Sequence, residues 1–117
     1  MIAVPTISSP WIAALTNTAG PGFANALSPL YSAGMAESPV LLLSGDSPRT
    51  ADGKGAFQEL DQITASTPFT KHSFRPERDD ELGRDIAEAI RIARSGRPGP
   101  VHLALPFDLL NATVGDI

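Results

Sequence analysis

Short runs of apolar residues, separated by polar loops that contain glycine, dominate the chain. The run at 40–43 is continuous, which is typical of a strand that is covered on both faces, and the runs at 12–16 and 101–105 predict two further buried strands. Apolar residues spaced three and four apart predict helices over 23–36 and 79–95. The order strand, helix, strand, helix, strand indicates an α/β fold of three layers, in which helices flank a mainly parallel sheet.

The segments between these elements complete a flavodoxin-like arrangement. We expect a polar loop over 46–58, a short helix over 60–65 and an irregular connector over 68–76. Three or four strands make a small sheet, because a doubly wound domain usually has about five or six. We therefore expect the domain to be incomplete.

Composition narrows the function classes. Apolar residues make up 42% of the 117 positions and charged residues 19%, which suits one globular domain with a core. The lack of cysteine excludes disulfides and thiolate metal sites, and the two histidines are too far apart in sequence to predict a metal site. The net charge of −4 predicts no nucleic-acid partner, and no apolar run nears the roughly 18 residues of a membrane span. A cytoplasmic location is the default, since no basic residue precedes the apolar start.

The common phosphate and nucleophile motifs are absent. Gly53-Lys54-Gly55 lacks the spacing of a Walker loop, and Gly20-Pro21-Gly22 is followed by Asn25 where a dinucleotide loop needs a third glycine. No nucleophile elbow surrounds Ser44. An unrelated nucleotide-binding domain therefore has no phosphate loop to support it.

Other motifs, each weak alone, resemble in their order the N-terminal, pyrimidine-binding domain of thiamine diphosphate-dependent enzymes of the acetolactate synthase-like superfamily. The resemblance runs from about Leu15 to Asn111. It rests on Gly20-Pro21-Gly22 with Asn25, Ser44-Gly45, Ala56-Phe57-Gln58-Glu59, Thr70-Lys71-His72, Gly96-Arg97-Pro98-Gly99-Pro100-Val101 and Leu105-Pro106-x-Asp108. It divides the chain into a poorly matching segment 1–11, a partial domain 12–110 that is incomplete at its N-terminus, and the start of a linker at 111–117.

The resemblance implies a pocket for the aminopyrimidine ring of the cofactor, with an apolar wall and a few placed polar groups. Five residues would bind the ring: Thr18, Pro21, Gly22, Asn25 and Gln58. Phe57 would line the substrate side. No metal ligand is expected in this chain, because another domain would hold the diphosphate through Mg²⁺. A requirement for FAD stays open.

Two departures from the family pattern bear on activity. Such enzymes use a glutamate upstream of the Gly-Pro-Gly turn to protonate the pyrimidine, and residues 1–36 contain no Asp or Glu. We therefore expect no catalytic residue in this chain. Phe107 stands where acetolactate synthases usually carry lysine, which favours less charged or larger acyl donors over a 2-oxo acid.

The sequence thus predicts part of an enzyme that makes or breaks a C–C bond next to a carbonyl, through acetolactate synthase, 2-oxo acid decarboxylase or carboligase chemistry. The isolated chain is expected to be inactive, and to need missing domains or a partner subunit in a homo-oligomer. The alternative is a non-catalytic assembly module, or a degenerate relative that keeps only the fold.

The other polar residues that stand out have structural interpretations. We expect His102, within a buried strand, to be a core histidine with satisfied hydrogen bonds. Lys71 and His72 are expected at the surface or at a domain contact, and the carboxylates at 77–81 at a solvated helix start. Trp11 is either core or interface.

Overall fold

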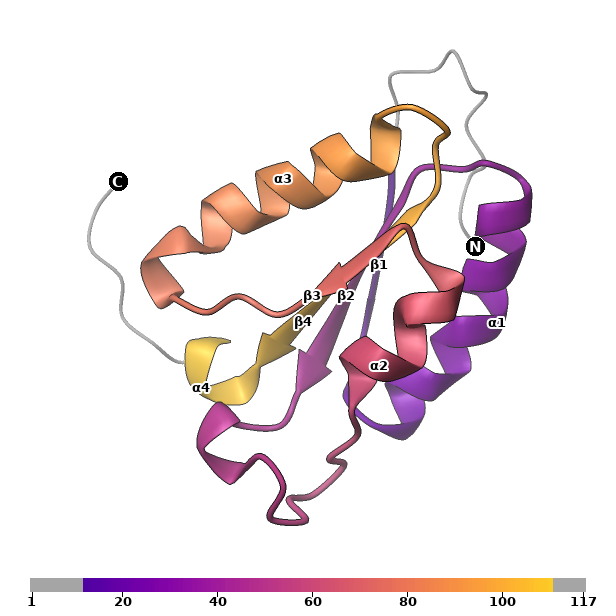
Figure 1. The fold of residues 1–117 in the computed structure, drawn as a ribbon. Coiled ribbons are helices and arrows are strands. Elements are labelled where there is room, and N and C mark those ends of the chain that lie inside the picture. The colour runs from indigo at the N-terminus through magenta and orange to yellow at the C-terminus, as the bar shows by residue number, and fades with distance from the viewer. Residues whose placement is uncertain (1–11, 111–117) are drawn as a thin grey trace.

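The computed structural model describes residues 12–110, and within them four strands form one parallel sheet in the order β1-β2-β4-β3 (Figure 1). The strands are β1 (Ala13–Asn17), β2 (Val40–Asp46), β3 (His72–Phe74) and β4 (Pro100–Pro106). β2 and β4 form the centre of the sheet, with Leu42 paired to His102. Because all strands are parallel, their carboxyl ends meet at one edge, which is where open α/β sheets usually bind ligands.

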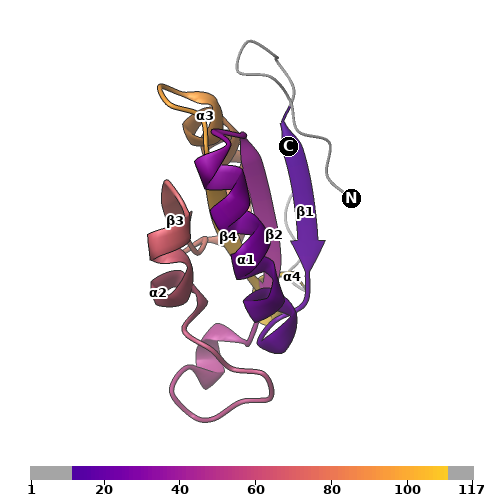
Figure 2. The same ribbon diagram turned by 90° about the vertical axis from the view of Figure 1, so that its right-hand side faces the viewer.

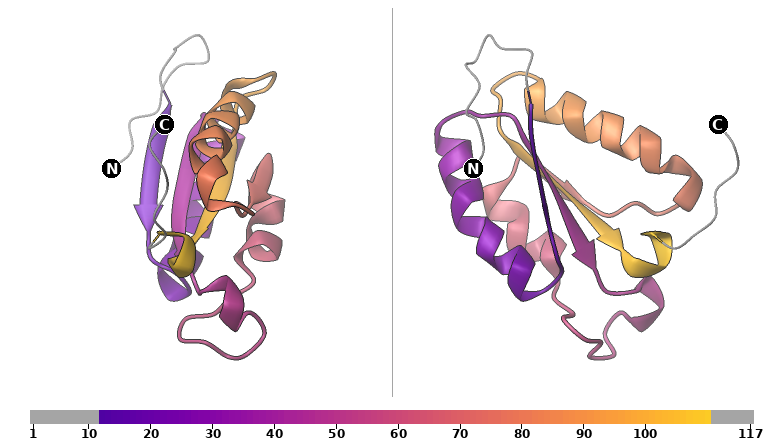
Figure 3. Two further views of the ribbon diagram at one scale, coloured as in Figure 1. Left: turned by 90° about the vertical axis from the view of Figure 1, so that its left-hand side faces the viewer. Right: turned by 180° about the vertical axis from the view of Figure 1, so that it is seen from behind.

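Helices cover both faces of the sheet, as the sequence predicts. Helix α1 (Pro21–Met35) and the short helix α2 (Gln62–Ser66) lie on one face (Figure 2). Helix α3 (Leu82–Arg94) covers the other face (Figure 3). Helix α4 (Phe107–Leu110) follows β4 directly at the carboxyl edge.

The core forms two layers because side chains alternate along each strand. From β2, Val40 and Leu42 pack with Phe23 and Leu30 of α1. Leu41, from the same strand, packs against α3 together with residues of β4. The continuous apolar run at 40–43 is therefore that of a strand buried on both faces.

The three-layer α/β prediction is confirmed, but several local boundaries differ. The helix predicted over 79–95 is α-helical over Leu82–Arg94 and is preceded by a 3-10 turn at Asp79–Glu81. The connector over 68–76 contains β3, and the strand predicted at 40–43 continues to Asp46, because main-chain pairing with β4 extends through polar Ser44 and Asp46. The helix predicted over 23–36 starts at Pro21, whose missing N–H costs nothing at a first helical position. Helix α4 was not predicted.

The predicted segments 1–11 and 111–117, with Trp11, lie outside the described residues, and the domain division remains a prediction. Within residues 12–110, no helix combines the length and apolar character needed to cross a membrane.

Candidate functional site

A cleft of about 520 Å³ opens at the carboxyl edge of the sheet. Its walls come from the segment after β1, the end of β2, the loop before α2 and the start of α4. Thr18, Gln58, Phe57 and Phe107 contribute to its lining. Segments far apart in sequence thus converge on one concave surface.

Gly20, in the loop after β1, packs closely against the segment that carries Gln58. Its φ of 60° lies in the left-handed region that favours glycine. A Cβ added to Gly20 would lie 2.9 Å from both the Cβ and the main-chain oxygen of Gln58, closer than side chains tolerate. Only glycine allows the two main chains to approach so closely here.

Gln58 is itself held in an unusual conformation. Its φ is 62°, which is costly for a residue with a side chain and is common at ligand sites. Phe57 beside it is 88% exposed, and Phe107 across the cleft is 61% exposed. Two aromatic side chains at a cleft are available to contact a flat or apolar ligand.

The structure gathers part of the predicted site in this cleft. Thr18, Phe57 and Gln58 line it. Gly22 lies behind Thr18, because a Cβ on Gly22 would be 3.1 Å from the Thr18 hydroxyl oxygen. Pro21 and Asn25 are exposed on the first turns of α1 and do not line the cleft. The roles expected for all six residues remain predictions.

Residues 8–65 match the family described as thiamine pyrophosphate enzyme, N-terminal TPP binding domain. The chain belongs to this family. The match covers β1, α1, β2 and the loop with Gln58, which together build most of the cleft.

Several curated relatives are similar to the chain over most of its length. The chain is 43% identical to 2-hydroxyacyl-CoA lyase 2 of Caenorhabditis elegans over 80% of its own length and 14% of that protein. It is 42% identical to acetolactate synthase of Arthrospira platensis, over 83% of the chain and 17% of the relative. It is also 42% identical to oxalyl-CoA decarboxylase of Escherichia coli strain K12, over 80% and 17%. The chain therefore spans only about a sixth of the length of these relatives.

The cleft fits the pyrimidine half of thiamine pyrophosphate in its chemistry. A heteroaromatic ring needs an apolar wall and a few polar groups, and Phe57, Leu105 and Phe107 stand beside the Thr18 hydroxyl and the Gln58 amide. The Gln58 amide both donates and accepts, so it suits a ring that carries an amino group and ring nitrogens. Within residues 12–110, no cluster of three His, Asp or Glu side chains is arranged to hold a metal ion.

The sequence did not indicate that Gln62 supports the candidate site. It lies in α2, is 1% exposed and accepts a hydrogen bond from the Gly20 N–H at 3.1 Å through Oε1. Its Nε2 group donates to the carbonyl of Gly45 at 3.0 Å. In the sequence it is one polar residue in a predicted short helix, and nothing there signals that it is buried.

His102 is a fully buried core histidine with satisfied hydrogen bonds, which confirms the prediction. Its Nε2 atom lies 2.7 Å from the Ser44 hydroxyl, and its Nδ1 atom lies 2.8 Å from the Ser73 hydroxyl. Burial lowers the pKa of His102 from 6.5 to about 4, so the ring is neutral at pH 7. The Phe23 ring packs on it with centroids 4.8 Å apart.

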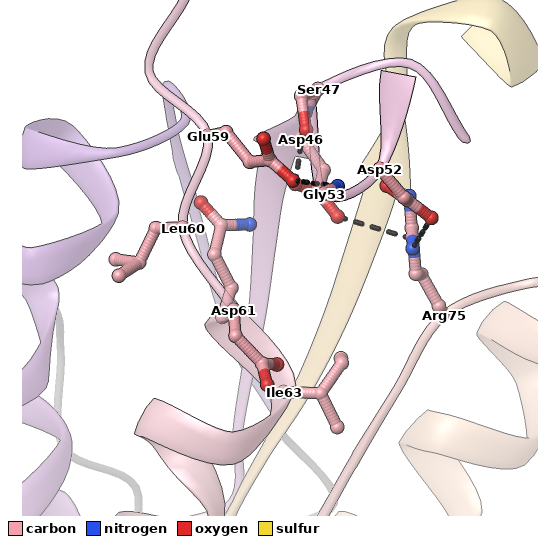
Figure 4. A pocket seen from close by; sticks show the side chains of 10 residues that line it. Asp46, Ser47, Asp52, Gly53, Glu59, Leu60, Asp61, Ile63 and Arg75 are labelled. Carbon is pink, nitrogen blue, oxygen red and sulfur yellow. Dashed lines mark hydrogen bonds and ion pairs between the residues drawn. The ribbon is translucent and has the colours of Figure 1, made fainter. Parts of the chain in front are cut away.

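A second pocket, of about 370 Å³, lies beside the cleft and carries charged groups (Figure 4). Arg75 forms ion pairs with Asp46 at 3.2 Å and with Asp52 at 2.9 Å. Burial raises the pKa of the Asp46 carboxyl above its ordinary 3.8, although Arg75 opposes that shift. The Glu59 carboxylate accepts hydrogen bonds from the N–H groups of Gly53 and Gly55. Asp46 also lines the cleft, so this cluster borders the candidate site.

Lys71 lies far from this edge. Its ammonium group donates hydrogen bonds to the carbonyls of Ile92 and Ser95 at the end of α3. These hydrogen bonds make Lys71 a cap on the C-terminal end of α3. The side chain of Lys71 also packs against Gly99 just before β4, at the amino edge of the sheet.

Proposed function

We propose that this chain forms the pyrimidine-binding side of a thiamine diphosphate site, in an enzyme that makes or breaks a C–C bond next to a carbonyl. The observation that carries the proposal is the close approach of Gly20 to Gln58 at a cleft with aromatic walls. The family match over residues 8–65 supports it.

The proposed role of each residue follows from the chemistry of its side chain. Gln58 would exchange hydrogen bonds with the amino group and a ring nitrogen of the pyrimidine, and the Thr18 hydroxyl would bond near the ring. Gly22 would keep Thr18 in place from behind, and Pro21 and Asn25 would contact the ring from the exposed first turns of α1. When bound, the cofactor supplies an electron sink at its thiazolium ring, and the protein supplies orientation.

Phe107 supports an acyl donor rather than a small anion as the substrate. It presents a 61% exposed ring to the cleft, where a lysine would instead attract a carboxylate. The names of two relatives, 2-hydroxyacyl-CoA lyase 2 and oxalyl-CoA decarboxylase, refer to acyl-CoA compounds. We therefore propose an acyl donor, with a 2-oxo acid as the other class to test.

The remaining parts of the complete enzyme lie outside this chain in the proposal. Mg²⁺ and the diphosphate would be held by another domain or by a partner subunit, in a homo-oligomer located in the cytoplasm. FAD has no part in the proposal.

The isolated chain would bind the pyrimidine without turning over a substrate. The described carboxylate that lines the cleft is Asp46, and it is engaged by Arg75 and by the N–H of Ser47. We expect no decarboxylation of a 2-oxo acid above a heat-killed control when thiamine diphosphate and Mg²⁺ are added. Turnover by the chain alone would contradict this.

Binding is the direct test of the proposed site. We expect thiamine diphosphate to shift the amide NMR signals of Thr18, Gly20 and Gln58 in the labelled chain. Gln58→Gly suits the φ of 62° and removes the amide, so it should weaken binding about tenfold, the loss of one good hydrogen bond.

Glu37→Gly is the matched control, because Glu37 also has a positive φ, of 54°, but follows the far end of α1. It should leave binding unchanged. Signal shifts that avoid the cleft would reject the proposed site.

A non-catalytic assembly module is the second candidate. Tyr31 and Met35 on α1 are 57% and 65% exposed, which suits a surface that contacts another protein. Light scattering of the chain separates the candidates: self-association without any binding of thiamine diphosphate would favour the assembly module.

A further inference from the structure

A connected set of uncharged polar side chains lies beneath the loop that contains Gly20. We call it the neutral ring, and it comprises Gln62, Ser44, His102, Ser73 and Ser66. All but Ser73 are at most 2% exposed. Buried polar groups are costly unless each finds a partner, so the hydrogen positions in this set are strongly constrained.

The amide of Gln62 can face only one way. Its Nε2 group donates to the Ser44 hydroxyl at 3.2 Å and to the Gly45 carbonyl at 3.0 Å, which uses both of its N–H groups. Its Oε1 atom accepts the Gly20 N–H at 3.1 Å. A flipped amide would place N–H against N–H at Gly20 and oxygen against oxygen at Gly45.

This orientation determines the tautomer of His102. Ser44 accepts from Gln62, so its own hydrogen is free to point at Nε2 of His102, 2.7 Å away. If Nε2 carried the proton instead, the Ser44 hydroxyl would accept twice, and no hydrogen bond described among residues 12–110 would use its hydrogen. A neutral His102 therefore carries its proton on Nδ1.

The remaining hydrogens then close the ring. Nδ1–H donates to Ser73 at 2.8 Å, and the Ser66 hydroxyl lies 3.0 Å from the same nitrogen. Ser73 donates to Ser66 at 2.6 Å, and Ser66 donates to the main-chain carbonyl of Gln62 at 2.8 Å. The chain of donors that leaves the Gln62 side chain thus returns to the Gln62 backbone.

We propose that Gln62 and His102 are positioning residues for the cleft: His102, as the Nδ1–H tautomer, orients the Ser44 hydroxyl that accepts from the Gln62 amide, and Gln62 holds Gly20 against Gln58. The consequence for ligand binding rests on the proposed function. A loop that is already ordered loses little entropy when a ligand binds, so the neutral ring would increase affinity without touching the ligand.

The first test is the ¹⁵N NMR spectrum of His102 at pH 7 in the 117-residue chain. We expect a pyrrole-type shift at Nδ1 and a pyridine-type shift at Nε2. The reverse assignment would overturn the proposal, because Ser44 would then be unable to direct its hydrogen as described.

The second test is hydrogen exchange at the Gly20 amide. Gln62→Leu should accelerate its exchange by about tenfold, the loss of one buried hydrogen bond. Thr64→Ala is the matched control, since Thr64 is exposed on the same helix and its hydroxyl donates to Asp61 rather than to the neutral ring. Unchanged exchange at Gly20 in Gln62→Leu would overturn the proposal.

Ser44→Ala provides a milder variant if Gln62→Leu does not fold. It removes the donor to Nε2, so His102 should shift toward a mixture of tautomers while Gly20 exchanges faster than in the wild type. An unchanged His102 spectrum would contradict the ring.

Titration with thiamine diphosphate separates this inference from the proposed function. We expect Gln62→Leu to bind about tenfold more weakly than the wild type, with Thr64→Ala unaffected. Equal binding by Gln62→Leu and wild type would overturn the positioning role. Absence of binding by the wild type would reject the proposed function, while the tautomer and the Gly20 exchange would still decide whether the ring holds the loop.

Discussion

Two polar clusters meet at the carboxyl edge of the sheet, and they are built in opposite ways. The neutral ring is uncharged and buried, and each hydroxyl or amide in it meets another. The ion-pair cluster, which we define as Arg75 with Asp46 and Asp52, is charged and lies at the rim of the second pocket (Figure 4). Ser44 of the ring and Asp46 of the cluster are two residues apart on β2.

The difference shows how a small domain can use polarity in two environments. Charged side chains at the buried position of the neutral ring would lose their hydration at a large cost in free energy. Amides, hydroxyls and a neutral imidazole can be buried there when each has a hydrogen-bond partner. Arg75 and Asp52 keep part of their hydration, and the ion pairs connect the loops around β2 and β3. The ring therefore sets geometry, and the ion pairs respond to salt.

The largest expected effect comes from breaking the neutral ring at its centre. His102→Ala should lower the free energy of unfolding by about 4 kcal/mol, because it leaves a cavity under Phe23 and removes a partner from three hydroxyls. Urea denaturation of wild type and variant measures the loss. A loss near 1 kcal/mol would show that the ring does not stabilise the fold.

Acid should weaken the fold through the same histidine. Its pKa is about 4 in the folded state and 6.5 ordinarily, so the unfolded chain takes up a proton first as pH falls. The contribution of His102 to the free energy of unfolding is complete above pH 6.5. It decreases by about 1.4 kcal/mol per pH unit down to pH 4, which is about 3 kcal/mol in all.

His102→Gln is the control for this pH dependence, since it cannot titrate. The raised pKa of Asp46 acts in the opposite direction in both proteins, so the difference between their urea midpoints isolates the histidine. Parallel pH profiles for the two proteins would refute this explanation.

The two loops at this edge should differ in their tolerance of a side chain. Gly20→Ala should cost about 3 kcal/mol, because the added Cβ meets Gln58 at 2.9 Å and φ is 60°. Gly55→Ala also has a positive φ, of 70°, but its Cβ meets open space, so it should cost about 1 kcal/mol. The urea midpoints of the two variants measure these losses: Gly20→Ala combines a steric clash with backbone strain, and Gly55→Ala has backbone strain alone. Equal losses of stability would show that Gly20 and Gln58 are not in contact.

Breaking the ion-pair cluster should have a smaller effect than breaking the neutral ring. Arg75→Met should cost about 2 kcal/mol, since it leaves the buried Asp46 carboxyl without its cation. The loss should shrink in 0.5 M NaCl, roughly a fivefold rise in ionic strength over 0.1 M, because screening weakens the wild-type pairs. His102→Ala serves as the contrast: its loss should not change with salt.

Much of the fold followed from local pattern. The continuous run at 40–43 and the amphipathic spacing over 79–95 each predict one type of element, and their order leaves few topologies. β3 escaped prediction because it has three residues, His72–Phe74, and forms only by pairing with β4. Helix α4 was also missed, because four residues after a proline are too few to show a helical spacing of apolar residues.

The candidate site was predictable only in part. The Gly-Pro-Gly turn and the Phe57-Gln58 pair are visible as motifs, and the structure brings Gly20 to Gln58. Pro21 and Asn25 share that turn in sequence, yet helix α1 carries them to its exposed side, away from the cleft. A residue's neighbours in sequence do not determine the direction of its side chain once a helix has begun.

The sequence by itself determined the fold class and the turn that demands glycine, because these depend on apolar periodicity and on local backbone sterics. The resemblance to the family came from the order of its motifs. Only the tertiary structure decided that Ser44, Gln62, Ser73 and His102 form one network, since the parallel strands and α2 bring together residues as much as 58 positions apart. Hydrogen bonds reach only about 3 Å, so their partners are determined by the packing of the elements and leave no periodic trace in the chain.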